Sequence, residues 1–144
     1  METKSFLEKL EHHRIVEAIA AAEAKTSGEI RVFIQHGQVD NPVAEAQAQF
    51  ERLGMTATRE RNAVLVFVAP RAQKFAVIGD EGIHRRCGLE FWQMLVEMMG
   101  EQFRTEHFTE ALVRAIGEAG DQLAQHFPIQ PDDRDELPNT IEEG

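Results

Sequence analysis

Residues 61–82 read RNAVLVFVAPRAQKFAVIGDEG, and this stretch decides the fold. Residues 62–69 form an almost unbroken apolar run, and residues 74–78 form a second, shorter run after a break at 70–72. Two β-prone runs separated by about four turn residues predict a β-hairpin. Because the first run has no polar side, we expect it to be a central strand that is covered on both faces.

The residues before the hairpin predict a helix, a strand and a second helix that lead into it. A helix is expected over about residues 10–25, where apolar residues recur at helical spacing. Residues 29–35 then alternate, which predicts a strand with Glu29 and Arg31 on its second side, most simply a solvent-facing surface. Asn41-Pro42 is typical of a helix start. Strand, helix and strand in this order predict a right-handed parallel βαβ crossover.

Two further helices are expected after the hairpin, and both have a regular apolar stripe. The stripes expected to be buried comprise Leu89, Trp92, Val96, Met99 and Phe103 in one helix, and seven residues between 108 and 123 in the other. In the helix that starts at Pro42, the expected buried stripe begins at Val43. The predicted fold class is therefore α/β, with a small mixed sheet sandwiched by about four helices. We expect one domain over 1–127 and an acidic tail without fixed structure over 128–144.

The composition excludes several classes of function. A net charge of −10 over 144 residues disfavours nucleic acid and anionic lipid as partners. The single cysteine, Cys87, allows neither an internal disulfide nor a site with several thiolate ligands. No window is apolar enough to cross a bilayer, and the first residues do not resemble a signal peptide. We therefore expect a cytoplasmic protein that does not insert into the membrane.

Common catalytic motifs are missing from the sequence. The chain has no phosphate-binding glycine loop and no His-Glu-x-x-His pair. Its two serines, Ser5 and Ser27, do not lie on a nucleophile elbow, which argues against a serine hydrolase. The six histidines are dispersed, which argues against a histidine metal site.

The acidic pair Asp80-Glu81, between Gly79 and Gly82, is the better candidate for chemistry. Carboxylates in a loop after a strand can bind Ca²⁺ or Mg²⁺, the two cofactors that this sequence suggests. Asp80 can equally cap the helix that follows it, and this simpler role is favoured. Glu23 lies in the apolar stripe of its helix, so it is either half exposed at the helix end or paired across the core.

Four segments in this order resemble the TPM domain family: TSGEIRVFI (26–34), LGMTATRERNAVLVFVA (53–69), KFAVIGDEGI (74–83) and FW (91–92). The resemblance covers roughly residues 10–127. It implies an α/β sandwich with a central sheet flanked by helices. The family includes thylakoid-lumen acid phosphatases of plants and many bacterial proteins without assigned roles. The chain is similar to a short cytosolic branch that is often encoded beside membrane-anchored relatives.

One departure from the family affects the expected site. Members that bind calcium commonly carry Asp-Asn-Gly at the start of the central strand, where this chain has Arg61-Asn62-Ala63. A guanidinium cannot ligate a cation. The hairpin would bring Arg61 close to Asp80, so an ion pair can replace the metal, with Glu23 or Glu29 joining the cluster. An Arg61 left partly free would instead bind an anion such as phosphate.

Three functions remain open at this point. The first is an interaction module that binds an unknown protein partner, such as a membrane-anchored relative. The second is a metal-dependent phosphatase with Asp80 as the anchoring ligand, and the third is a Ca²⁺- or Mg²⁺-binding module without turnover. Candidate metal ligands are Asp80 and Glu81, and the candidate anion-binding or salt-bridge cluster is Arg61, Asn62, Glu29 and Glu23.

Overall fold

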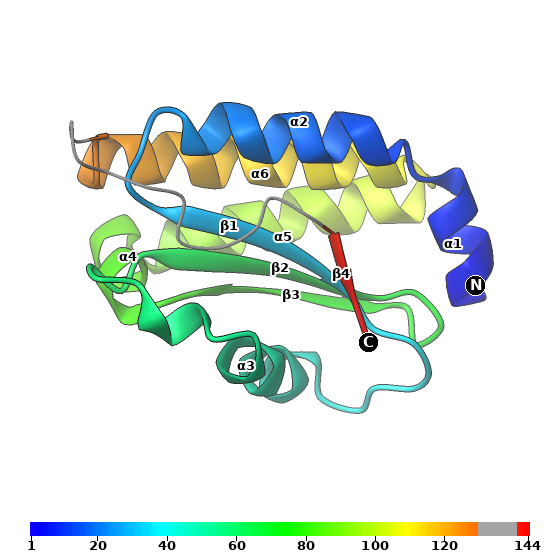
Figure 1. Ribbon diagram of the computed structural model, residues 1–144. Helices are drawn as coiled ribbons and strands as arrows, with labels where there is room; N and C mark the ends of the chain where they lie inside the picture. The colour runs from blue at the N-terminus through cyan, green and yellow to red at the C-terminus, as the bar shows by residue number, and fades with distance from the viewer. Residues whose placement is uncertain (130–140) are drawn as a thin grey trace.

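A mixed sheet forms the centre of the molecule (Figure 1). The computed structural model describes residues 1–129 and 141–144. Within these residues the sheet has four strands in the order β3-β2-β1-β4, with bounds β1 (Glu29–Ile34), β2 (Ala63–Ala69), β3 (Lys74–Gly79) and β4 (Ile141–Glu143). Strand β1 pairs in parallel with β2 and with β4, whereas β2 and β3 are antiparallel. The predicted βαβ crossover and hairpin are confirmed.

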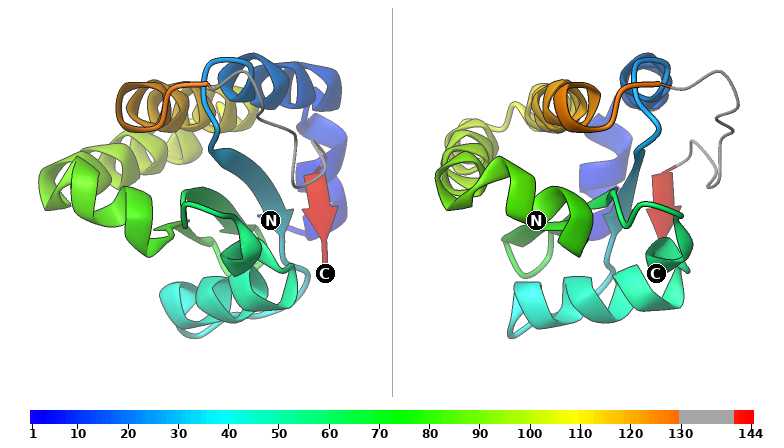
Figure 2. Two further views of the ribbon diagram at one scale, coloured as in Figure 1. Left: turned by 60° about the vertical axis from the view of Figure 1, so that its left-hand side comes forward. Right: turned by 90° about the vertical axis from the view of Figure 1, so that its left-hand side faces the viewer.

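Helices cover both faces of this sheet (Figures 1 and 2). The helices are α1 (Thr3–Lys9), α2 (His12–Glu23), α3 (Pro42–Arg52), α4 (Glu81–Cys87), α5 (Leu89–Arg104) and α6 (Phe108–His126), with a 3-10 turn η1 (Met55–Ala57). Helices α2, α5 and α6 lie on one face, and α3 lies on the other. The predicted α/β sandwich is therefore confirmed. Within the described part of the chain, no helix combines the length and the apolar character needed to span a bilayer.

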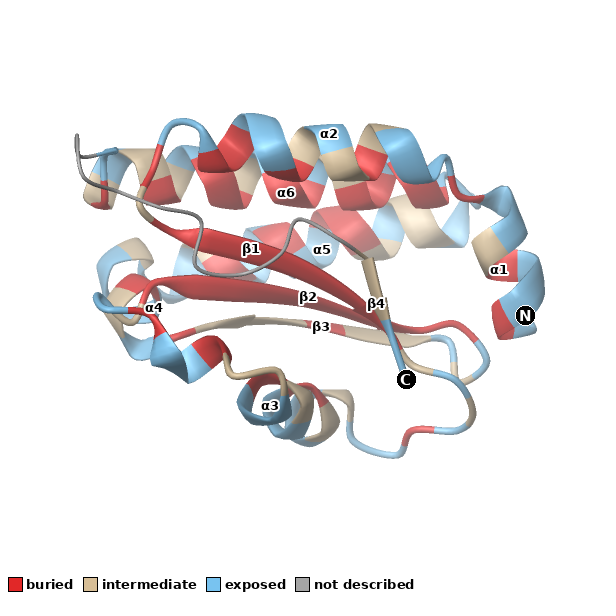
Figure 3. Ribbon diagram, viewed as in Figure 1, coloured by how far each residue is buried: buried red, intermediate tan, exposed pale blue. Residues whose placement is uncertain are grey.

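Two hydrophobic cores result from the two-residue periodicity of the strands. Alternate residues of β1 and β2, such as Ile30 and Val66, pack against α2, α5 and α6. The intervening residues, such as Phe33 and Phe67, pack against Phe50 of α3. Every residue of β1 and β2 is buried as a result (Figure 3). This confirms β2 as a central strand covered on both faces.

The prediction that the side of β1 carrying Glu29 and Arg31 faces solvent is wrong. Glu29 and Arg31 are only 1% and 5% exposed. They lie on the side of the sheet that α3 covers, and the guanidinium of Arg31 donates to the carbonyl oxygen of Leu53 at 3.4 Å and to the carboxylate of Glu142 at 2.6 Å. Alternation of polar and apolar residues therefore distinguishes the two sides of this strand but does not show which side meets water.

The expected helix stripes need a second correction. Leu89 and Val96 of α5 are 66% and 41% exposed, and Val43 of α3 is 50% exposed. Of the predicted stripe of α5, Trp92 and Met99 are confirmed as buried, and Leu95 and Met98 are buried in addition. The inward face of α5 thus centres on Leu95 and Met98–Met99, and Leu89 and Val96 lie outside it. In α6 the expected stripe is confirmed.

The end of the chain adds a strand that the sequence did not predict. Most of the expected unstructured tail, residues 130–140, lies outside the described residues. The expectation is wrong for 141–143, which form β4 beside β1. The amide of His36 donates to the carbonyl of Gly144 at 2.7 Å, and the amide of Gly144 donates to Ile34 at 3.1 Å. The ion pair between Arg31 and Glu142 also ties β4 to the sheet.

Candidate functional site

The candidate residues gather where β2 begins and β3 ends. Antiparallel pairing places Val64 opposite Gly79, so the residues just outside the two strands must meet. The amide of Asp80 continues the ladder by donating to the carbonyl of Ala63 at 2.9 Å. The hairpin therefore brings Arg61 and Asp80 together, as its pairing predicts.

Arg61 and Asp80 form a two-pronged ion pair. Nε of Arg61 donates to Oδ2 of Asp80 at 2.7 Å, and Nη2 donates to Oδ1 at 2.9 Å. Such fork geometry is the strong form of an arginine–carboxylate contact. Asp80 is buried and Arg61 is partly exposed, while the exposed carboxylate of Glu81 lies 3.6 Å from Nη1 of Arg61. The hydrogen bonds with Asp80 raise the pKa of the Arg61 guanidinium, which therefore stays charged.

Asp80 also begins helix α4. Its Oδ1 accepts a hydrogen bond from the amide of Glu81 at 2.8 Å, so Asp80 is the N-cap of α4, as predicted. The same carboxylate therefore closes the hairpin end and starts the helix.

The backbone around Arg61 is unusual. Arg61 has a φ of 53°, a left-handed conformation that asparagine, aspartate and glycine adopt more readily than arginine. Its carbonyl accepts from the amide of Gly82 at 2.8 Å. A Cβ on Gly82 would lie 2.3 Å from the carbonyl oxygen of Glu60 and 2.5 Å from that of Arg61. Only glycine allows the start of α4 to pack this closely on the loop before β2.

Asn62 anchors a neighbouring loop. It is buried, its amide nitrogen Nδ2 donates to the hydroxyl of Ser27 at 3.2 Å, and its backbone amide donates to the hydroxyl of Thr58 at 3.3 Å. Among the described residues, its Oδ1 has no hydrogen-bond partner. Ser27 and Thr58 were not identified from the sequence, since single hydroxyl residues in polar loops give no signal.

Glu23 and Glu29 are buried near this site but lie outside the ion pair. Glu23 is 5% exposed, which contradicts the alternative that it is half exposed at the helix end. Its Oε2 accepts from the amide of Ile30 at 2.8 Å and so ties the end of α2 to the start of β1. Within the part of the chain that the structure describes, neither Glu23 nor Glu29 forms an ion pair with Arg61.

The arrangement does not fit a divalent cation well. Both carboxylate oxygens of Asp80 already accept hydrogen bonds, and the Arg61 guanidinium faces them. Glu81 is the remaining acid beside the pair. Among the described residues, no three His, Cys, Asp or Glu side chains form a group that could hold a metal ion. Because hard cations prefer about six oxygen ligands, a cation would have to displace the guanidinium.

Comparison with known proteins gives the family. The model of the TPM domain matches residues 1–122, well over half of the chain. The chain belongs to the TPM domain family. A similar solved structure is that of the BA42 protein from the psychrophilic bacterium Bizionia argentinensis, determined by NMR. It is 40% identical, the match covers 93% of this chain and 92% of that one, and the TM-score is 0.85. No curated protein matches the chain.

Proposed function

We propose that this TPM domain is a non-catalytic interaction module of the cytoplasm that works with membrane-associated proteins. The observation that carries the proposal is the two-pronged ion pair of Arg61 with Asp80. A cation site at this place needs an acid whose oxygens are free to ligate the ion. Here both carboxylate oxygens of Asp80 accept hydrogen bonds from Arg61, and Oδ1 also accepts one from the amide of Glu81.

The charge of Arg61 argues in the same direction. A divalent cation that approached Asp80 would be repelled by the guanidinium, whose nitrogens lie 2.7 and 2.9 Å from the carboxylate oxygens. Phosphate esters could be attracted to Arg61, but turnover also needs a nucleophile or an activated water. Among the described residues, no hydrogen bond joins the side chain of a serine, cysteine or histidine to Arg61 or Asp80, and no three His, Cys, Asp or Glu side chains form a group that could hold a metal ion. Binding is therefore favoured over catalysis.

The exposed apolar residues of α5 supply a surface for protein contacts. Leu89 and Val96 are seven residues apart, so they lie on one face of the helix, and both are well exposed. Apolar side chains at the centre of an interface lose water when the partner binds. The membrane-associated partner follows from the resemblance of this chain to TPM proteins that are encoded beside membrane-anchored relatives.

A capture experiment tests the proposal. The tagged chain is incubated with detergent-solubilised membranes from its native cells, and retained proteins are identified by mass spectrometry. We expect a membrane protein to be retained by the wild type and lost with the double variant Leu89→Ser/Val96→Ser. Val43→Ser is the matched control, because Val43 is equally exposed but lies on α3, across the sheet. No retained protein above background, or equal retention by the double variant, contradicts the proposal.

The phosphatase alternative has its own assay. Hydrolysis of p-nitrophenyl phosphate is measured with Ca²⁺, Mg²⁺ or Mn²⁺ for the wild type and for Asp80→Ala. We expect no turnover above the buffer rate in any condition. Metal-dependent turnover by the wild type that Asp80→Ala abolishes would refute the interaction proposal and establish a metal-assisted phosphatase.

A further inference from the structure

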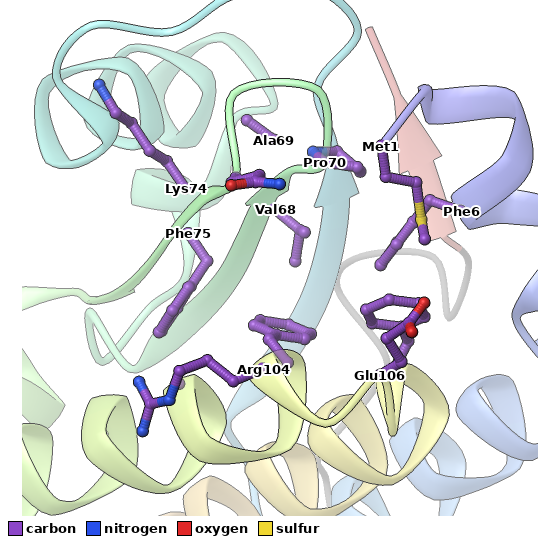
Figure 4. A pocket seen from close by; sticks show the side chains of 13 residues that line it. Met1, Phe6, Val68, Ala69, Pro70, Lys74, Phe75, Arg104 and Glu106 are labelled. Atoms are coloured by element: carbon purple, nitrogen blue, oxygen red, sulfur yellow. The ribbon is translucent and has the colours of Figure 1, made fainter.

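A pocket lies at the end of the hairpin opposite the Arg61–Asp80 pair. It is formed by the turn between β2 and β3 together with α1, the end of α5 and the start of α6 (Figure 4). Its volume is about 480 Å³. This is within the range of about 300–1,000 Å³ in which proteins bind small organic ligands.

Four phenylalanine rings from four different elements line one wall of this pocket. Phe75 of β3 meets Phe103 of α5 edge to face, with 5.1 Å between ring centroids. Phe103 lies 6.2 Å from Phe108 of α6, and Phe108 lies 4.9 Å from Phe6 of α1. The rings form a continuous series in the lining of the pocket, with Phe75 and Phe6 at its two ends (Figure 4). Aromatic walls of this kind favour a flat or elongated apolar guest.

The charged side chains of the pocket are not equivalent. The amine of Lys74 is directed away from the pocket and donates to the carbonyl of Asp40 at 2.8 Å (Figure 4). The carboxylate of Glu106 accepts from the amine of Lys9 at 3.3 Å, so its charge is balanced. Arg104 is exposed, and within the described residues it forms no ion pair. A cationic group therefore remains available at the edge of an apolar pocket.

We propose that this pocket binds a small amphipathic anion, a molecule with an apolar body and one carboxylate or sulfonate group. The body packs on the ring series from Phe75 to Phe6, where it leaves water. The anionic group lies at the rim and accepts hydrogen bonds from the guanidinium of Arg104, whose fork matches a carboxylate. The positive rim selects the anion on a chain that is otherwise strongly acidic.

The phenylalanine rings and the guanidinium of Arg104 together determine which molecules the pocket selects. A hydrophilic anion such as phosphate gains only the exposed contact with Arg104, which is weak in water. A neutral apolar molecule gains only the burial of its surface. A molecule with both parts gains both contributions, so the pocket distinguishes it from either component alone.

Naphthalene-2-carboxylate is a suitable probe, and its binding is followed by ¹H–¹⁵N NMR titration of the full chain. We expect saturable shifts at Phe75, Gly100, Phe103 and Arg104, and none at Arg61. The matched control ligand is 2-naphthylmethylammonium, which has the same ring system and the opposite charge. We expect its affinity to be lower by about tenfold or more, because it meets Arg104 as a like charge.

Variants separate the two parts of the pocket. Arg104→Gln should weaken binding of the carboxylate by about tenfold, whereas Arg114→Gln, an exposed arginine of α6 outside the pocket, should leave it unchanged. Gly100→Leu should abolish binding by filling the pocket. A Cβ on Gly100 would lie 3.4 Å from Nη1 of Arg104 and 3.8 Å from the ring of Phe75, so the backbone accepts a side chain there.

Gly117→Leu is the control for Gly100→Leu, because it makes the same change in α6 where an added Cβ meets nothing within 4 Å. A dispersed NMR spectrum confirms that each variant is folded. The proposal is overturned if the carboxylate gives no saturable shifts, if the ammonium analogue binds equally well, or if folded Gly100→Leu binds like the wild type.

Discussion

Replacing Gly82 with alanine should destabilise the protein, although the same change usually stabilises a helix. The added Cβ would lie 2.3 Å from the oxygen of Glu60 and 2.5 Å from that of Arg61, and real Cβ atoms do not come within 3.0 Å of such atoms. Both oxygens belong to the backbone, so no side chain can rotate away and the loop before β2 must move. Overpacking of this kind costs about 1–3 kcal/mol.

Two smaller contributions nearly cancel. Movement of the loop weakens the hydrogen bond from the amide of Gly82 to the carbonyl of Arg61, 2.8 Å in the wild type, which is worth about 1 kcal/mol. Alanine is better than glycine in a helix by about 1 kcal/mol. The expected loss in the free energy of unfolding for Gly82→Ala is therefore about 2 kcal/mol, the cost of the overpacking itself.

Urea denaturation followed by circular dichroism measures this difference. Gly117→Ala is the matched control in α6, where an added Cβ meets nothing within 4 Å, and we expect it to gain about 0.5–1 kcal/mol. Opposite signs for the two variants support the close packing of α4 on the loop that carries Arg61. If Gly82→Ala were as stable as Gly117→Ala, the loop could not lie where it positions Arg61 against Asp80.

Two further predictions concern other parts of the fold. Glu142→Gln should lower the free energy of unfolding by about 1–3 kcal/mol, because it leaves the buried guanidinium of Arg31 without its carboxylate. The control Glu143→Gln should cost far less, since its partner His36 is exposed. Equal urea midpoints for these two variants would contradict the inference that the ion pair of Arg31 with Glu142 of β4 stabilises the fold. Burial raises the pKa of Cys87 to about 11, which lowers its thiolate fraction at pH 8 about a hundredfold. Because a thiolate of higher pKa is also more nucleophilic, the folded protein should react with Ellman's reagent about tenfold more slowly than a free cysteine. A reaction in the folded state as fast as that of a free cysteine would refute the burial. Because the unfolded chain releases the thiol proton at lower pH, the contribution of Cys87 to the free energy of unfolding should be lost as pH rises toward about 11.

The central part of the fold could be predicted from short stretches of sequence. The runs at 62–69 and 74–78 identify the hairpin, because an apolar segment with no polar side has to be covered on both faces. The pairing of Arg61 with Asp80 follows from the same hairpin, since antiparallel strands return the chain to its starting end. Local pattern and turn chemistry were sufficient for these features.

Other features depend on contacts between distant segments, which a local pattern does not contain. Glu29 and Arg31 alternate with apolar residues as on an exposed strand, but both are buried, and Arg31 contacts Leu53 after α3 and Glu142 of β4. Strand β4 itself has only three residues, and its partner β1 lies more than a hundred residues earlier. Leu89 and Val96 match a helical stripe, yet the rotation of α5 about its axis is set by its neighbours.

In the candidate site, too, some features follow from local sequence and others depend on contacts between distant segments. Asp80 as an N-cap was predicted from its place before a helix and is confirmed. Glu23 instead binds the amide of Ile30, a partner that depends on how α2 meets the sheet. The packing of Gly82 on the carbonyls of 60 and 61 also required the structure, since a glycine beside acids fits any flexible loop.

A calcium titration followed by ¹H–¹⁵N NMR tests the central claim, that the ion pair of Arg61 with Asp80 stands where a cation would bind. We expect the wild type to show no saturable shifts at residues 59–63 and 79–83. Arg61→Asp, which removes the guanidinium and adds a carboxylate, should show them at the same calcium concentrations. Saturable shifts confined to these residues in the wild type would contradict the claim.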